Sequence, residues 1–166
     1  MINQTITHFT NVDNMPSILS DGILKLEGWN VEAAIEQIAL GNVSAEQVVH
    51  PSGLDIRYLW HQMCKKYRLI GRYVWLTEEN DVRCITSQRY FEKKEIRFDA
   101  DEINARRWVD VMDQKSKKSI KARKLIKHLN ESATKTGDDI TKWWVVDTDI
   151  PLGLSKSIKQ NNKLAA

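Results

Sequence analysis

The chain has 166 residues, of which 42% are hydrophobic and 28% are charged, and its formal net charge is +3. This length and balance predict one soluble globular domain with a sizeable core, and the charge is far from that of a histone-like polycation. A mildly basic chain is compatible with a nucleotide or nucleic-acid partner but does not require one. No stretch approaches the roughly 20 apolar residues of a membrane span, and residues 1–10 lack the basic start and apolar run of a signal peptide. We therefore expect a cytoplasmic protein without a membrane partner.

The cysteine content excludes two common kinds of site. Cys64 and Cys84 are the only cysteines, and they lack the close spacing of a metal-binding pair. No third or fourth ligand accompanies them, so neither a zinc site nor a disulfide framework is implied. We expect reduced thiols and no bound metal.

The N-terminal segment predicts a strand, a helix and a second strand. Isoleucine, phenylalanine and β-branched threonines favour a strand over residues 6–10. A helix is expected over residues 11–22, where an asparagine or aspartate caps the start and Gly22 stands at the C-cap. The chain then turns back into a short apolar strand. This arrangement delivers His8 and Thr10 to the mouth between a strand and a helix.

The next segment predicts two helical units. Apolar residues recur at helical spacing after residue 28 and end before residue 41, and Ser44 with Gln47 forms a capping-box pattern ahead of a short second helix. A turn is expected over residues 50–53, followed by a helix over residues 54–67 with a basic flank. Both units are compatible with partner or phosphate contacts, and equally with ordinary packing and a solvated charged face.

The remaining elements are expected to complete one domain over residues 1–155, with a polar, flexible tail over residues 156–166. Residues 82–91 give no clear pattern. The other predicted elements are a strand over 73–77, an acidic turn over 78–81, a strand over 93–98, a short helix or irregular segment over 101–112, a helix over 114–130, a polar loop over 131–139 and an apolar strand over 140–150.

The helix predicted over residues 114–130 is the one strongly cationic element of the sequence. Lys121, Arg123 and Lys124 lie at its centre and are the candidate contacts for a nucleic acid or another acidic partner. A run of like charge is also typical of a plain solvated face.

The N-terminal pattern resembles a known family. A strand with His-x-Thr, a helix of the form N-x-x-S-I-L-x-x-G and a short apolar strand are similar to the opening of NAD-dependent ADP-ribosyltransferases, in particular the bacterial and phage branch that includes the DNA-modifying DarT toxins. Residues 73–77, with the sequence YVWLT, resemble the aromatic-x-Ser/Thr strand of the second motif of that family. The resemblance covers the first third of the chain well, the middle partly and the end poorly.

The resemblance implies a fold and a function. The fold would be an α+β domain in which a split, mostly antiparallel sheet surrounds a central NAD cleft with flanking helices. The function would be NAD-dependent transfer of ADP-ribose to a macromolecular acceptor, protein or nucleic acid, in a phage- or toxin-like setting. NAD would be a substrate, and the enzyme would belong to the glycosyltransferases.

Roles in the expected cleft follow from matching positions. His8 would hydrogen-bond the ribose hydroxyls of NAD, because a neutral imidazole both donates and accepts. Thr10, Tyr73, Trp75 and Thr77 would bind the nicotinamide end, with Trp75 packing on the ring and Thr77 supporting it. Two plainer interpretations stay open, in which Trp75 is a core residue and His8 is a strand-end histidine with no catalytic task.

The catalytic carboxylate is where the sequence departs from the family. Cleavage of NAD passes through a transition state with oxocarbenium character, which a nearby carboxylate stabilises. The family places this glutamate at the start of a late strand, where the present sequence has Thr141 and Lys142. Glu95 heads the other late strand and is our candidate, with Arg97 on the same face as a cofactor contact. Four further carboxylates lie near the late strand, namely Glu131, Asp138, Asp139 and Asp147.

Two alternatives follow if no carboxylate reaches the cleft. The domain would use Arg97 and Arg72 on phosphates, as the related RNA 2′-phosphotransferases use His and Arg residues. Otherwise it would be a non-catalytic binding or inhibitor protein on the same fold, which contacts nucleic acid or a partner through the basic helix at residues 115–128. A carboxylate within reach of His8 and Thr77 would favour the enzyme.

Overall fold

The computed structural model describes residues 4–79 and 93–160. The strands are β1 (Thr5–Asn11), β2 (Ile23–Leu24), β3 (Val74–Thr77), β4 (Lys93–Asp99), β5 (Arg106–Arg107), β6 (Trp143–Val146), β7 (Ile150–Pro151) and β8 (Ser155–Gln160). The helices are α1 (Met15–Asp21), α2 (Trp29–Ala39), α3 (Ile56–Ile70), α5 (Trp108–Lys118) and α6 (Ile120–Lys135). These elements form an α+β structure around a six-stranded antiparallel sheet of order β5-β6-β3-β1-β4-β8, and β2 pairs separately with β7.

The sheet is continuous on one side of β1 and nearly interrupted on the other. β1 pairs with β4 at seven successive positions, from Thr5 opposite Asp99 to Asn11 opposite Lys93. Its pairing with β3 is confined to Thr7 opposite Thr77. Beyond that pair β1 and β3 diverge, so the sheet opens at its centre.

Both faces of the sheet are covered. On one face α1 and the β2-β7 pair pack over Ile6, Ile96 and Phe98. On the other face α5 and α6 pack over β3 and β6, with Trp108 at the centre of the cluster. Strand alternation on β6 sends Val145 into the second cluster and the next residue into the first, because successive side chains point to opposite faces. Two apolar layers therefore hold the open sheet together.

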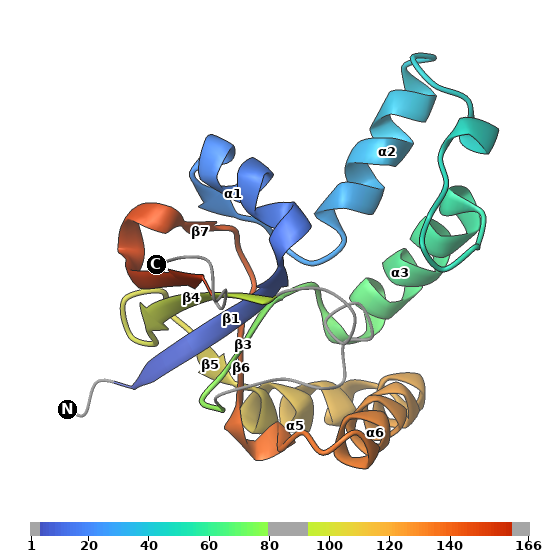
Figure 1. Cartoon of the computed structure of the whole chain (residues 1–166). Coiled ribbons are helices and arrows are strands. Elements are labelled where there is room, and N and C mark those ends of the chain that lie inside the picture. Colours follow the sequence, from blue (N-terminus) through green and yellow to red (C-terminus); the bar gives the residue numbers. More distant parts are fainter. Residues whose placement is uncertain (1–3, 80–92, 161–166) are drawn as a thin grey trace.

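The helices α2 and α3 pack against each other and project away from the sheet as an arm (Figure 1). Between them lies a short 3-10 helix over Ala45–Gln47, and the predicted capping box between Ser44 and Gln47 is present. The predicted N-terminal helix is also confirmed, because α1 follows a 3-10 turn that Asn11 caps and ends at Gly22, whose φ is +66°.

The cationic segment differs from its prediction. One helix over residues 114–130 was expected, and the structure has α5 and α6, separated at Ser119. The extended backbone of Ser119 (φ −158°, ψ 150°) ends α5, and its hydroxyl caps α6 by accepting from the Ala122 N–H. The prediction of a polar loop over residues 131–139 is wrong for residues 131–135, which belong to α6. The helix continues there because Ala133 packs into the core.

The C-terminal region also differs. The strand predicted over residues 140–150 is broken into a 3-10 turn over Ile140–Lys142, β6 and β7. The flexible tail expected from residue 156 is wrong for residues 156–160, which lie in β8 and extend the sheet beyond β4. The polar, lysine-containing sequence SKSIKQ suits such an edge strand. The end of the predicted tail, residues 161–166, lies outside the described residues.

The remaining expectations concern membrane spans, the two cysteines and residues 78–91. Within residues 4–79 and 93–160 no helix has the length and apolar composition to cross a bilayer. Cys64 is a partly buried free thiol on α3. Cys84, the unassigned segment 82–91 and the second half of the acidic turn at residues 80–81 lie outside the described residues.

Candidate functional site

A cavity of about 600 Å³ lies where β1 and β3 diverge. Its volume falls within the range of small-molecule sites, about 300–1,000 Å³. The wall comes from β1, β3, the segment between β2 and α2, α3 and α6. Five residues selected from the sequence line it, namely His8, Thr10, Tyr73, Trp75 and Thr77.

His8 bridges the gap between the diverging strands. Its Nδ1 lies 2.8 Å from the backbone oxygen of Trp75. Because a carbonyl oxygen only accepts, Nδ1 must carry the proton and Nε2 is left as an acceptor. Burial lowers the pKa of His8 below its ordinary value of 6.5, against the opposing effect of the bond to Trp75, so the neutral ring is favoured near neutral pH. The cavity therefore contains a neutral imidazole of fixed tautomer.

The lowered pKa of His8 predicts a dependence of stability on pH. Because the pKa of His8 is lower in the folded protein than the 6.5 of the unfolded chain, the unfolded chain takes up the proton more readily as the pH falls. The contribution of His8 to the free energy of unfolding is therefore complete above pH 6.5 and is lost at lower pH. We expect the free energy of unfolding of the wild type to fall, relative to that of His8→Asn, between about pH 7.5 and about pH 5. Urea unfolding at both pH values measures this difference. Asparagine keeps a donor for Trp75 but does not titrate, so parallel pH curves for the two proteins would contradict the assignment.

Trp75 is at once a core residue and a lining residue. Its ring makes edge contacts with Tyr73, Trp108 and Trp143 at centroid distances of 5.6, 4.9 and 5.6 Å. Its indole N–H donates to Glu27 at 2.8 Å. The hydroxyl of Tyr73 donates to a backbone oxygen of α3, and burial raises its pKa. Both aromatic side chains are therefore fixed in orientation at the cavity wall.

The two threonines of the site are nearly buried and have local partners. The hydroxyl of Thr77 accepts from the Glu79 N–H at 3.0 Å and donates to the Lys142 backbone oxygen at 3.4 Å. The hydroxyl of Thr10 accepts from the Asn14 amide at 3.2 Å. Thr77 therefore links the end of β3 to the beginning of β6.

Glu95 and Arg97 do not line the cavity. In the β1–β4 register Ile96 stands opposite His8, so its two neighbours on β4 belong to the other face of the sheet. The carboxylate of Glu95 and the guanidinium of Arg97 lie 3.8 Å apart and pair with each other. Glu95, the candidate catalytic carboxylate, and Arg97, the candidate cofactor contact, are thus absent from the lining, although the β1 residues opposite them, Phe9 and Thr7, are part of it. Arg72 does not line the cavity either, and its guanidinium forms an ion pair with Glu32 at 2.8 Å.

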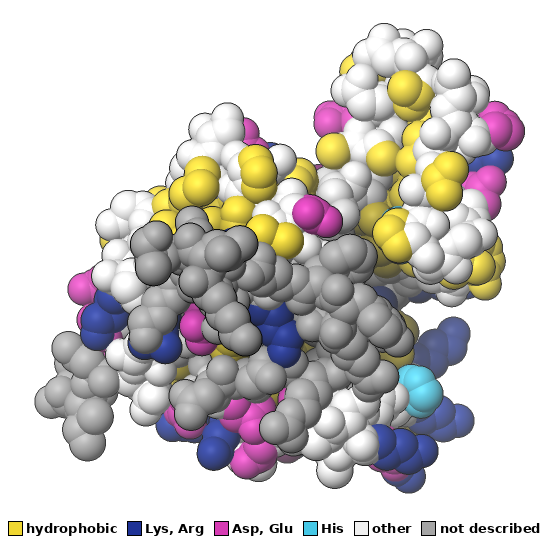
Figure 2. Space-filling view, viewed as in Figure 1, with side chains coloured by type: hydrophobic (Ala, Val, Ile, Leu, Met, Phe, Trp, Pro, Cys, Tyr) yellow, Lys and Arg dark blue, Asp and Glu magenta, His cyan; other side chains and the backbone are white. Residues whose placement is uncertain are grey.

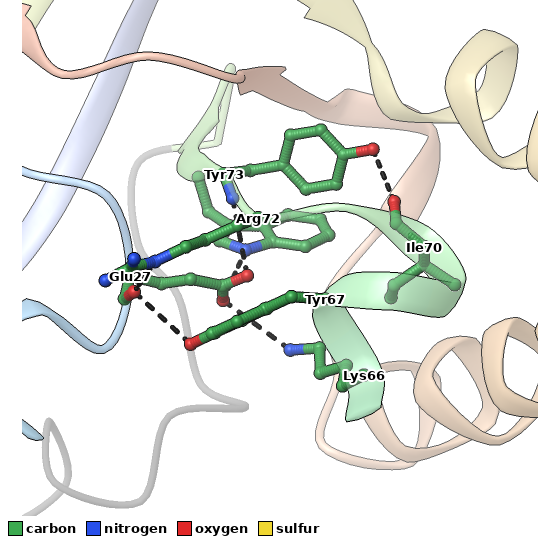
Figure 3. A network of polar contacts seen from close by, with 7 residues as sticks. Glu27, Lys66, Tyr67, Ile70, Arg72 and Tyr73 are labelled. Atoms are coloured by element: carbon green, nitrogen blue, oxygen red, sulfur yellow. Dashed lines mark hydrogen bonds and ion pairs between the residues drawn. The ribbon is translucent and has the colours of Figure 1, made fainter. Parts of the chain in front are cut away.

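The lining does contain a carboxylate that the sequence did not single out, Glu27 (Figure 3). It belongs to the segment between β2 and α2. Besides Trp75, its carboxylate contacts Lys66 at 3.5 Å and the Tyr73 N–H at 3.4 Å. No local pattern marks this residue, because its partners lie on α3 and at the start of β3. Among the described lining residues, Glu27 is the only acidic one.

At the start of β6, where the family glutamate was expected, Thr141 and Lys142 are both exposed. The Asp139 carboxylate accepts there from the N–H and the hydroxyl of Thr141, at 3.0 and 2.6 Å. The Glu79 carboxylate in turn accepts from the Asp139 N–H. Burial raises the pKa of Glu79. Glu79 is not part of the cavity lining.

The helix α6 connects the cavity to the cationic surface. Leu125, Leu129 and Ala133 of this helix line the cavity together with His128, a residue that the sequence did not single out. The three cations selected from the sequence are exposed on the same helix, namely Lys121, Arg123 and Lys124. In Figure 2, Lys and Arg side chains (dark blue) gather at the lower right of the molecule, the region that α6 occupies in Figure 1.

No group of three or more His, Cys, Asp or Glu side chains in the described parts of the chain is arranged to hold a metal ion. Comparison of the chain with models of protein families, with curated proteins and with solved structures gave no match. Its function must therefore be inferred from the cavity and the chemistry of the side chains that line it.

Proposed function

We propose that this chain binds NAD in the cavity between β1 and β3 and transfers its ADP-ribose to a macromolecular acceptor, protein or nucleic acid. The observation that carries the proposal is the bond from His8 Nδ1 to the Trp75 oxygen at the opening of the sheet. It joins the two motifs that resemble the family in one site of suitable volume. The central opening of the antiparallel sheet is in keeping with the split sheet of ADP-ribosyltransferases.

The cavity offers groups for each end of the reacting bond. Cleavage breaks the bond between the ribose C1′ and the pyridinium nitrogen, and the electron pair leaves with nicotinamide. An oxygen or nitrogen of the acceptor then gives an electron pair to C1′, and its proton passes to solvent. Nε2 of His8 accepts a hydrogen bond from a ribose hydroxyl. The wall formed by Trp75 and Thr77 receives the nicotinamide ring.

A titration of isotopically labelled protein with NAD tests where the ligand binds. The chain has six tryptophans, whose indole N–H groups give separate resonances. We expect the Trp75 resonance to shift on binding, because this indole lines the cavity, and the Trp108 resonance to move much less, because its indole is bonded to Asn130 inside the core. An unchanged Trp75 resonance at millimolar NAD would contradict the proposal.

A second function, binding of nucleic acid without transfer, is favoured by one observation. Lys121, Arg123 and Lys124 are exposed on a single helix, and positive side chains on one helix can follow a phosphate backbone. This surface adjoins the cavity but does not depend on His8. The two functions can therefore be separated by mutation.

Charge reversal on α6 tests the second function. We expect Lys121→Glu with Lys124→Glu to weaken binding of a single-stranded oligonucleotide about tenfold and to lower its salt dependence by about two phosphate contacts. Arg123 is retained because its guanidinium donates to the backbone of α5. Fluorescence anisotropy at several salt concentrations measures both quantities. Lys65→Glu with Arg68→Glu on α3 is the matched control, and an equal loss in the control would show a general charge effect only.

A further inference from the structure

The backbone of the segment that carries Glu27 is fixed by three hydrogen bonds. Its N–H donates to the Tyr73 oxygen at 2.9 Å. Its carbonyl oxygen accepts from Arg72 Nε at 2.8 Å and from the Tyr67 hydroxyl at 3.2 Å. Figure 3 shows these partners converging on Glu27 from α3 and the start of β3. The carboxylate therefore starts from a backbone position that cannot shift freely.

The next residue fixes the segment from the other side. Gly28 has a φ of +78°, in the region that favours glycine. A Cβ atom there would lie 2.5 Å from the Tyr67 hydroxyl oxygen and 2.6 Å from Met63 Cε. The arm formed by α2 and α3 thus packs directly against the segment that brings Glu27 to the cavity.

The carboxylate itself is held by donors of three kinds. The Trp75 indole donates to one oxygen at 2.8 Å, and the Lys66 ammonium lies 3.5 Å from the same oxygen. The Tyr73 N–H donates to the other oxygen at 3.4 Å. Because these donors already hold the carboxylate in place, it does not need to move in order to stabilise a positive charge that develops beside it.

We propose that Glu27 is the catalytic carboxylate of this protein. The inference rests on the proposed cleavage of NAD. As the bond from C1′ to nicotinamide breaks, the electron pair leaves with nicotinamide and positive charge develops on the ribose. Glu27 stabilises that charge until the acceptor adds to C1′ and its proton passes to solvent. Glu27 thus supplies, from the segment after β2, the carboxylate that is missing at the start of β6.

Glu78 provides a matched comparison for Glu27. Its carboxylate also accepts from a tryptophan indole, that of Trp144 at 3.1 Å, and also pairs with a cation, Arg107 at 3.3 Å. The two glutamates are similarly exposed, 21% for Glu27 and 19% for Glu78. They differ in place, because Glu78 is not part of the cavity lining. Replacing each by glutamine removes one charge from a similar environment.

The test measures NAD affinity and the rate of nicotinamide release for the wild type, Glu27→Gln and Glu78→Gln. Glutamine can still accept from the Trp75 indole, so we expect Glu27→Gln to bind NAD within about threefold of the wild type. We expect its kcat for nicotinamide release to fall about 100-fold, a typical loss when one fixed electrostatic group is removed. Glu78→Gln should keep the kcat of the wild type.

The outcomes separate the two proposals. If the wild type releases nicotinamide and Glu27→Gln does so at the same kcat, the role of Glu27 is overturned while the proposed function stands. Loss of NAD binding in a folded Glu27→Gln protein, in which the Trp108 resonance is that of the wild type, would also overturn the catalytic role of Glu27. Such a loss would show that Glu27 contributes to NAD binding. A wild type that neither binds NAD nor releases nicotinamide would overturn the proposed function itself.

Discussion

Replacement of His8 by alanine is expected to lower the rate of nicotinamide release by about 100-fold, a typical loss when a group that positions the substrate is removed. The side chain bonds the Trp75 oxygen and leaves Nε2 to accept from the ribose of NAD. Alanine removes this acceptor and leaves the Trp75 carbonyl without its side-chain donor. Chromatographic measurement of nicotinamide at several NAD concentrations gives kcat and KM for both proteins.

The control for this variant is a histidine outside the cavity. His61 is exposed on α3 and does not line the cavity, so His61→Ala should keep the activity of the wild type. The indole spectrum of His8→Ala shows whether its fold is intact. Full activity in a folded His8→Ala protein would mean that the cavity between β1 and β3 is not the site of cleavage.

Replacement of Trp108 by alanine is expected to lower the free energy of unfolding by about 3–5 kcal/mol. The side chain is 0% exposed, and its ring contacts those of Tyr73 and Trp75. Its indole also donates to Asn130 on α6 at 3.1 Å. Alanine would leave a large void between the sheet and the two helices, and chemical denaturation measures the loss.

A surface leucine provides the control for Trp108. Leu40 is 69% exposed at the end of α2, so Leu40→Ala should change the free energy of unfolding by less than about 0.5 kcal/mol. If Trp108→Ala cost less than about 1 kcal/mol, the packing of α5 and α6 on the sheet would differ from that described. A destabilised but folded variant should also bind NAD more weakly, because Trp75 at the cavity wall packs on Trp108.

Elements with strong local signals could be predicted from the sequence. β1 has β-branched residues, Asn11 caps the 3-10 turn that follows it, and α1 ends at Gly22, all within one short segment. The strand expected over residues 93–98 is present as β4, with its side chains alternating as expected. Neighbouring residues determine these features, so they can be recognised without knowledge of the tertiary structure.

Features that depend on distant parts of the chain could not be predicted. Alternation separated Glu95 from Ile96, but only the register with β1 shows that Ile96 is the one beside His8. Glu27 reaches the cavity through Tyr73 and Trp75, which are 46 and 48 positions further along the chain. The sequence therefore indicates both strands of the cavity, whereas Glu27, the carboxylate that lines it, can be recognised only in the tertiary structure.

The C-terminal half illustrates a second limit. A single serine ends α5 and caps α6, which outweighed the helical pattern on either side of Ser119. The polar, lysine-rich composition of residues 156–160 is typical of a flexible tail, but these residues form a strand because they pair with β4. Edge strands have one solvated side, so their composition resembles that of a loop.

The most direct measurement is the release of nicotinamide from NAD by the purified wild-type protein. Water can add to C1′ in place of the acceptor, so the proposed cleavage can be followed before the acceptor is identified. We expect slow, saturable release that depends on His8. No release and no binding at millimolar NAD would contradict the account, and the cationic surface of α6 would then be the place to look for a partner.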